Sequence, residues 1–74
     1  MQVIVWSKND CPQCESAKRL LKMKGVDYEE RNLSTGQWNK EDLFAMAQGA
    51  RSVPQIFFDE KCIGGLSDLQ RMIG

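Results

Sequence analysis

Two cysteines, placed where an apolar run gives way to a helix, constrain the fold of this 74-residue chain more than any other feature. The run "QVIVW" (2–6) is short and rich in β-branched residues, which predicts a buried strand. After the polar stretch "SKND", Cys11 stands directly before Pro12, and proline is favoured at the first position of a helix. Cys14 falls one helical turn later. The sequence therefore predicts a β-α-β unit that carries the cysteine pair at the start of its helix.

This first helix is expected to end before Gly25 and to bury an apolar stripe at helical spacing. The stripe consists of Cys14, Ala17, Leu20 and Leu21. A second helix is predicted after Asn39, because Asp42 stands at the capping-box position. Trp38 and Leu43 occupy the positions of a hydrophobic staple around that cap. The predicted apolar face of the second helix is Leu43, Phe44, Met46 and Ala47, with Gly49 as the stop.

Three further strands are predicted at "VDYEERNL" (26–33), "PQIFF" (54–58) and "KCIG" (61–64), and the last two form a hairpin. A last short helix is expected to begin at Ser67, with Gln70 completing a second capping box. It would dock on the sheet through Leu69, Met72 and Ile73. The order β-α-β-α-β-β-α predicts a single α/β domain over all 74 residues, with a four-stranded mixed sheet flanked by three helices.

Composition excludes several classes of function. Ten basic and ten acidic side chains give zero net charge, so nothing favours nucleic acid or an anionic membrane as a partner. The first apolar run is too short for a signal peptide or a membrane helix, and we therefore expect a cytoplasmic protein. Histidine is absent, which removes Cys-His catalysis and every zinc site that needs histidine. We expect no metal site.

The cysteine pair has three interpretations: a metal clamp, a structural staple or a redox centre. Zinc usually takes four ligands, and Cys62 is the one further cysteine. Cytosolic thiols are kept reduced, which disfavours a staple. A redox pair fits best, because the free N–H groups and the positive end of the helix dipole face Cys11 and favour its thiolate. Cys14 would face inward, with the two Cα atoms about 5–6 Å apart, within disulfide range.

The surroundings of this pair are less well specified. Lys8 is the one basic residue expected near Cys11, and the Cys11 sulfur is expected to be exposed. Cys62 is expected to be a small packing residue beside the hairpin turn. A zinc half-site and an inert pair stay open as alternatives.

Three separate segments, "CPQC", "SVPQIF" and "IGGLSDL", resemble a glutaredoxin of the thioredoxin-like superfamily. The resemblance runs from Val3 to about Leu69. It implies a dithiol disulfide oxidoreductase, in which Cys11 is the nucleophile and Cys14 the resolving cysteine.

The resemblance also implies a glutathione-binding groove. Lys8 would contact a carboxylate of glutathione. The backbone of Val53, before a cis Pro54, would pair with the cysteinyl part. The double glycine would let the ligand approach closely, and Ser67 and Asp68 would hold its γ-glutamyl end. The full set of expected binding residues is Lys8, Gln13, Ser52, Val53, Pro54, Gly65, Ser67 and Asp68.

Activity and partners follow from the same resemblance. The chain would reduce protein disulfides or glutathione mixed disulfides, with glutathione as reducing co-substrate and no bound cofactor. Gln13 stands where dithiol glutaredoxins commonly have tyrosine, and the chain is short. Both features are similar to small redoxins that donate electrons to ribonucleotide reductase and are recycled by thioredoxin reductase instead of the glutathione reductase system. A monomer without nucleic-acid or membrane partners is expected.

Two other classes of function stay open. One is a glutathione-ligated iron–sulfur binding module. Relatives of that kind have a single active-site cysteine followed by glycine, whereas Pro12 and Cys14 follow Cys11 in this chain. The other is a non-catalytic subunit that only docks to a partner, which the intact C-x-x-C motif disfavours.

Overall fold

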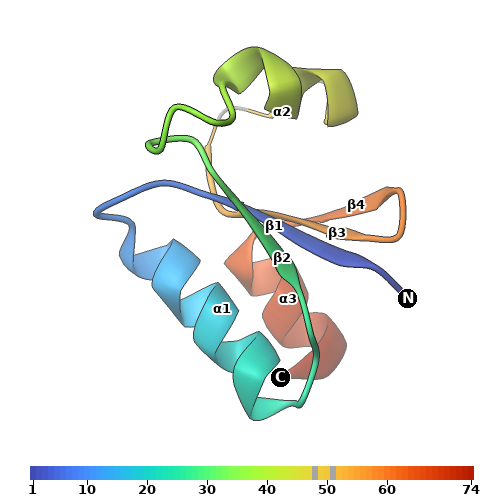
Figure 1. Cartoon of the computed structure of the whole chain (residues 1–74). Helices are drawn as coiled ribbons and strands as arrows, with labels where there is room; N and C mark the ends of the chain where they lie inside the picture. Colours follow the sequence, from blue (N-terminus) through green and yellow to red (C-terminus); the bar gives the residue numbers. More distant parts are fainter. Residues whose placement is uncertain (48, 51) are drawn as a thin grey trace.

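The elements follow one another in the predicted order (Figure 1). The computed structural model describes residues 1–47, 49–50 and 52–74. The elements are β1 (Val3–Ser7), α1 (Pro12–Met23), β2 (Glu29–Asn32), α2 (Lys40–Met46), β3 (Gln55–Phe58), β4 (Lys61–Gly64) and α3 (Leu66–Ile73). No helix in these described segments is long and apolar enough to cross a membrane.

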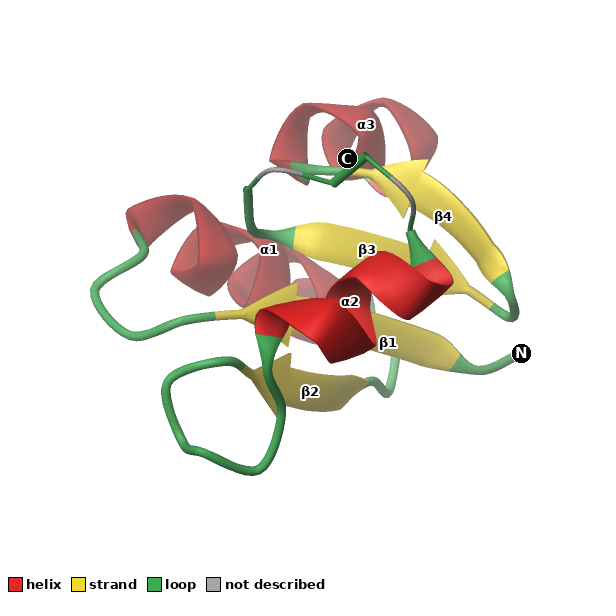
Figure 2. Cartoon of the chain, turned by 90° about the horizontal axis from the view of Figure 1, so that it is seen from above, coloured by secondary structure: helices red, strands yellow, loops and turns green. Residues whose placement is uncertain are grey.

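The strands form one sheet in the order β2-β1-β3-β4. Strand β1 runs parallel to β2, with Val5 opposite Glu30, and antiparallel to β3, with Val5 opposite Ile56. Strands β3 and β4 form the predicted antiparallel hairpin. Helices α1 and α3 cover one face of the sheet and α2 lies over the other (Figures 1 and 2). The predicted four-stranded mixed sheet flanked by three helices is confirmed.

Strand β1 is buried along its whole length, because it has a strand on each side and helices over both faces. Its successive side chains point to opposite faces. The core under α1 and α3 consists of Val3, Val5, Ala17, Leu21, Ile56 and Leu69. The core under α2 consists of Ile4, Trp6, Leu43 and Phe57. The strand that leads into the cysteine loop is thus held by both cores.

Local signals predicted the starts of the first two helices correctly. Cys11 is the N-cap of α1, and a proline occupies the first helical position. At α2 the Asp42 N–H donates to Asn39 Oδ1 at 3.0 Å, and the Asn39 N–H donates to Asp42 Oδ2 at 2.9 Å. Trp38 packs against the cluster that contains Leu43, in agreement with the predicted staple.

The predicted start of the last helix was wrong. Gly65 is the N-cap of α3, two residues before Ser67. Asp68 rather than Gln70 completes the cap, because its Oδ2 accepts a hydrogen bond from the Gly65 N–H at 3.1 Å. A carboxylate in the first turn also complements the helix dipole. Ser67 therefore belongs to the exposed surface of the first turn.

The second strand is shorter than predicted, covering Glu29–Asn32 rather than 26–33. The Val26 N–H donates to the Leu21 carbonyl at 2.9 Å, so this part of the backbone still completes the end of α1. Only the residues beyond this turn are free to pair with β1.

Two predicted apolar faces are also partly wrong. Helix α2 ends at Met46, before Gly49, and buries Leu43 alone. Phe44 and Met46 are 43% and 37% exposed. In α3, Met72 is exposed, whereas its neighbour Leu69 is buried. Both helices are short and contact the sheet through a narrow stripe, so residues beside that stripe face outward.

Candidate active site

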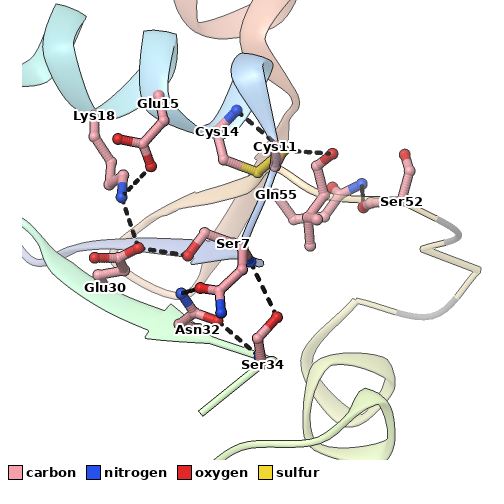
Figure 3. Close-up of a disulfide and its surroundings, with 12 residues drawn as sticks. Ser7, Cys11, Cys14, Glu15, Lys18, Glu30, Asn32, Ser34, Ser52 and Gln55 are labelled. Atoms are coloured by element: carbon pink, nitrogen blue, oxygen red, sulfur yellow. Dashed lines mark hydrogen bonds and ion pairs between the residues drawn. A yellow bond between two sulfur atoms is a disulfide. The ribbon is translucent and has the colours of Figure 1, made fainter.

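The cysteine pair lies at the N-terminus of α1, directly after the loop that follows β1 (Figure 3). Cys11 and Cys14 form a disulfide, and their Cα atoms are 5.2 Å apart, as the helical spacing predicted. The backbone N–H of Cys14 donates to Cys11 Sγ at 3.2 Å. Because this amide is one of the unpaired donors of the first helical turn, it favours negative charge on the sulfur once the disulfide is reduced.

Burial distinguishes the two sulfurs, although less sharply than expected. Cys14 is fully buried, and Cys11 is 7% exposed, so the expected open exposure of Cys11 was wrong. The loop before β3 covers it: Cys11 Sγ lies 3.9 Å from the carbonyl oxygen of Val53. Cys11 lines the open surface shared with Lys8 and Glu15, so a substrate sulfur can reach it there, whereas the fully buried Cys14 is not accessible from solvent.

The loop before β3 contains the predicted cis peptide bond between Val53 and Pro54. Pro54 is buried, and Ser52 is exposed. The Ser52 carbonyl accepts a hydrogen bond from Gln55 Nε2 at 2.9 Å, which ties the loop to the start of β3 (Figure 3). The loop thus presents the Val53 backbone beside the cysteine pair.

A groove of about 220 Å³ beside this loop brings together three segments that are far apart in the sequence. Seven predicted site residues line it, namely Gln13, Ser52, Val53, Pro54, Gly65, Ser67 and Asp68. Gln55 and Leu66 also line it, and neither was predicted as a site residue. Gln55 had a detectable signal, since it is a polar residue directly after Pro54 at the start of an otherwise apolar strand.

The double glycine lets the turn between β4 and α3 form one wall of the groove. Gly64 has φ +111°, a conformation that side chains disfavour, and a Cβ there would overlap the carboxylate of Asp68. A Cβ on Gly65 would lie 3.3 Å from the carbonyl oxygen of Pro54. Gly64 therefore leaves room for the Asp68 carboxylate, and Gly65 lets the turn pack closely against the cis-proline loop.

Comparison with known proteins agrees with this geometry. The family model described as glutaredoxin matches residues 3–63. The chain belongs to the glutaredoxin family. It is 39% identical, over its full length, to a probable glutaredoxin of Synechocystis, of which it covers 82%.

Solved structures support the same assignment. A wheat glutaredoxin superimposes with a TM-score of 0.85 at 32% identity, over 97% of this chain and 70% of that one. A buckwheat glutaredoxin in complex with glutathione has a TM-score of 0.77 at 28% identity, over 93% of this chain and 64% of that one. The predicted thioredoxin-like fold is confirmed, and the chain is a disulfide oxidoreductase of the glutaredoxin type.

Lys8 is the one predicted binding residue of this glutaredoxin that does not line the groove. It is exposed and lines the surface beside Cys11, together with Asp10. It also lies near Val53, in a second hollow on the other side of the loop. The structure thus brings Lys8 next to the cysteine pair, as predicted, but outside the groove that ends at Asp68.

Asp68 has two partners within its own helix. Its Oδ2 accepts from the Gly65 N–H, and its Oδ1 forms an ion pair with Arg71 at 3.0 Å. An amino group of a ligand in the groove would compete with the Arg71 guanidinium for this carboxylate. The predicted contact between Asp68 and the γ-glutamyl end of glutathione therefore requires Arg71 to share or release the carboxylate. The Arg71 side chain is exposed, so it is free to move away.

A charged cluster beside the cysteine pair was not predicted (Figure 3). Lys18 Nζ lies 2.7 Å from Glu15 and 2.8 Å from Glu30, and the Ser7 hydroxyl donates to Glu30 at 2.6 Å. Lys18 lines the same surface as Cys11, although Lys8 was the one base expected there. Residues 11, 15 and 18 share one face of α1 because they are three to four positions apart.

These contacts shift the pKa values of two members in opposite directions. Burial alone would raise the pKa of Glu30, but hydrogen bonds from Lys18 and Ser7 and the Lys18 charge together lower it. Burial alone would lower the pKa of Lys18, but its bonds to Glu15 and Glu30 raise it. Both shifts favour the charged forms of Glu30 and Lys18.

Cys62 was predicted to be a packing residue, and this was wrong. It is exposed, with its Sγ 3.5 Å from Gln55 Oε1. Its cross-strand partner Phe57 is buried under α2. Strand β4 lies at the edge of the sheet, and α2 is too short to cover it as well.

Proposed function

We propose that this glutaredoxin reduces protein disulfides and glutathione mixed disulfides through its Cys11–Cys14 dithiol, with glutathione as the recycling reductant. The observation that carries the proposal is the asymmetry of the pair. Cys11 alone reaches the surface, beside a groove formed by the Val53 backbone and the N-terminus of α3. Cys14 is enclosed directly behind it.

The reductive half-reaction needs no other group. The Cys11 thiolate attacks one sulfur of a substrate disulfide, so a Cys11–substrate disulfide forms and the other substrate sulfur leaves as a thiolate that takes a proton from water. Cys14 then loses its proton to solvent, and its sulfur attacks Cys11 Sγ. The second substrate thiolate leaves, and two electrons have passed from the dithiol to the substrate.

Glutathione would restore the dithiol by the reverse sequence. One glutathione thiolate attacks Cys11 and releases Cys14, and a second attacks the mixed disulfide and leaves as glutathione disulfide. The buckwheat relative binds glutathione, and we carry that ligand over to this chain. A tripeptide spans at most about 10 Å when extended. We place it along the Val53 backbone, between Lys8 and Asp68, with its sulfur at Cys11.

The deciding experiment supplies NADPH and a disulfide substrate with one of two recycling systems. We expect turnover with glutathione and glutathione reductase. Turnover with thioredoxin reductase alone would overturn the choice of reductant. In a Lys8→Gln variant, we expect a raised KM for glutathione and an unchanged single-turnover rate on a substrate disulfide. This result would place the carboxylate of glutathione at Lys8.

We propose the cytoplasm as the location, because a dithiol centre needs a reducing compartment. We propose ribonucleotide reductase as one protein acceptor, on the strength of Gln13 and its likeness to the small redoxins. Reduction of the oxidised reductase by the prereduced chain, followed by thiol titration, tests this acceptor. No transfer of electrons in that mixture would remove it.

A further inference from the structure

We propose that a hollow between α2 and the Val53 loop receives a bulky apolar side chain of the protein substrate, with an Asp or Glu beside it. The inference rests on the proposed function and adds to it a class of protein substrate. It concerns a surface on the opposite side of the Val53 loop from the proposed glutathione groove.

The hollow is apolar and of side-chain size. Leu33, Leu43, Phe44 and Val53 contribute to its lining, and its volume is about 170 Å³. Sites for whole small molecules usually measure about 300–1,000 Å³, so this hollow suits one side chain rather than a cofactor. Phe44 is 43% exposed, and it is the one exposed large aromatic residue in the described part of the chain. Helix α2, which carries it, lies over its own face of the sheet (Figure 2).

The charge around the hollow has one sign. Lys8 and Lys40 both line it, and no Asp or Glu among the described residues does. Neither ammonium group belongs to an ion pair formed within the described residues. Glu41 follows Lys40 in the chain but does not line the hollow. In a protein of zero net charge, this local pair of lysines favours an acidic partner over a basic one.

The hollow is continuous with the reactive centre. Val53 lines both the hollow and the groove, and its carbonyl lies 3.9 Å from Cys11 Sγ. Lys8 lines both the hollow and the surface next to Cys11. A polypeptide whose disulfide is attacked at Cys11 therefore has neighbouring residues within reach of Phe44. Glutathione, which we place between Lys8 and Asp68, carries no bulky apolar side chain that could fill this hollow.

The test uses the prereduced full chain in single-turnover reactions, so that no recycling system is needed. The probes are synthetic peptides with one disulfide-bridged cysteine pair, flanked on both sides by Phe-Glu, by Phe-Lys or by Ser-Glu. The mixed disulfide of glutathione and 2-mercaptoethanol is the small substrate. We expect the Phe-Glu peptide to be reduced about tenfold faster than either other peptide, because one anchoring side chain is worth this much at an interface.

Variants then locate the effect. Phe44→Ser is expected to slow reduction of the Phe-Glu peptide about tenfold and to leave the rate on the small substrate unchanged. Phe44→Leu is expected to keep most of the preference for the Phe-Glu peptide. Lys40→Glu is expected to shift the preference toward Phe-Lys. Met72→Ser removes an apolar side chain that is 53% exposed, on α3, and serves as the matched control.

The outcomes separate this inference from the proposed function. The docking site would be overturned if the three peptides were reduced at equal rates. It would also be overturned if both Phe44 variants lost the same fraction of their rate on the Phe-Glu peptide and on the small substrate. Disulfide reduction itself would stand in either case. Failure of the unaltered chain to reduce any of the four substrates would overturn the proposed function itself.

Discussion

The backbone N–H of Cys14 donates to the sulfur of Cys11 at 3.2 Å, across one turn of the helix that both residues begin. The resolving residue thus stabilises the nucleophile through its backbone, before its own sulfur takes part. Because this donor belongs to the main chain, replacing the Cys14 side chain leaves it in place.

This arrangement predicts different outcomes for the two serine variants. Cys14→Ser keeps the amide and the reactive Cys11, so it is expected to form a mixed disulfide with a substrate and stop there. Cys11→Ser is expected to lose all exchange, because the Cys14 sulfur is buried. Mass spectrometry of the adducts measures both, with Cys62→Ser as the control that changes nothing. A substrate adduct on Cys14 in the Cys11→Ser variant contradicts the assignment.

A second prediction concerns the ionisation of Cys11. In the reduced protein, the rate of iodoacetamide alkylation of Cys11 is expected to rise with a midpoint below the ~8.5 of a free thiol. Its position at the helix N-terminus is the physical reason. Cys62 is exposed and lies in β4 instead of capping a helix, so it provides an internal reference. Equal midpoints for the two cysteines would rule out an activated Cys11.

A third prediction compares two glycines with similar backbone strain. Gly64→Ala is expected to destabilise the fold by about 2–3 kcal/mol, from the positive φ together with the overlap with Asp68. Gly36→Ala has a positive φ but open space around its Cβ, so about 1 kcal/mol is expected. Urea unfolding measures both. Equal costs would show that the contact between Gly64 and Asp68 adds nothing.

A fourth prediction follows from the charged cluster beside the cysteines. The pKa of Glu30 is lowered on folding from its ordinary 4.5, so its contribution to stability is present above that pH and is lost as the pH falls through the lower folded value. Glu30→Gln is expected to cost about 1 kcal/mol at pH 7 and to flatten the acid limb of the stability curve.

Glu15→Gln is the matched control for that change, because Glu15 also contacts Lys18 but is 61% exposed. A cost of no more than a few tenths of a kcal/mol is expected for it. Urea unfolding between pH 3 and 7 compares the two variants with the unaltered chain. If both variants have the same acid limb as the unaltered chain, Glu30 does not carry the predicted charge linkage.

The elements that the sequence predicted well depend on signals between near neighbours. Pro12 after Cys11 marked the start of α1, and Asn39 with Asp42 marked the start of α2. Pro12 has a fixed φ and lacks the N–H that would be unpaired at this position, whereas Asn39 and Asp42 exchange hydrogen bonds. Both effects act within one helical turn, so the sequence alone specifies them. The Cα separation of the cysteine pair followed from the same helical geometry.

The errors arise where near neighbours in the sequence do not decide the structure. The segment "GLSDLQ" contains two overlapping capping patterns, and the fold forms the one in which Asp68 accepts from the Gly65 N–H. The exposure of Phe44 depends on how little of α2 touches the sheet, which no periodicity reveals.

The groove could be anticipated only through the family resemblance. Gln13, Val53 and Gly65 come from three segments that meet through the sheet topology, and nothing near any of them in the sequence points to the other two. Lys18 was missed for a related reason: it lies on α1, and its partner Glu30 lies on β2, which pairs in parallel with β1.

The complete burial of Cys14 limits how many partners the cysteine pair can react with at once. Every disulfide exchange of the pair takes place at the Cys11 sulfur. A partner bound there as a mixed disulfide therefore blocks the next partner until the Cys14 sulfur has displaced the first one. The cysteine pair therefore reacts with one partner protein at a time, and it cannot link two partners to each other.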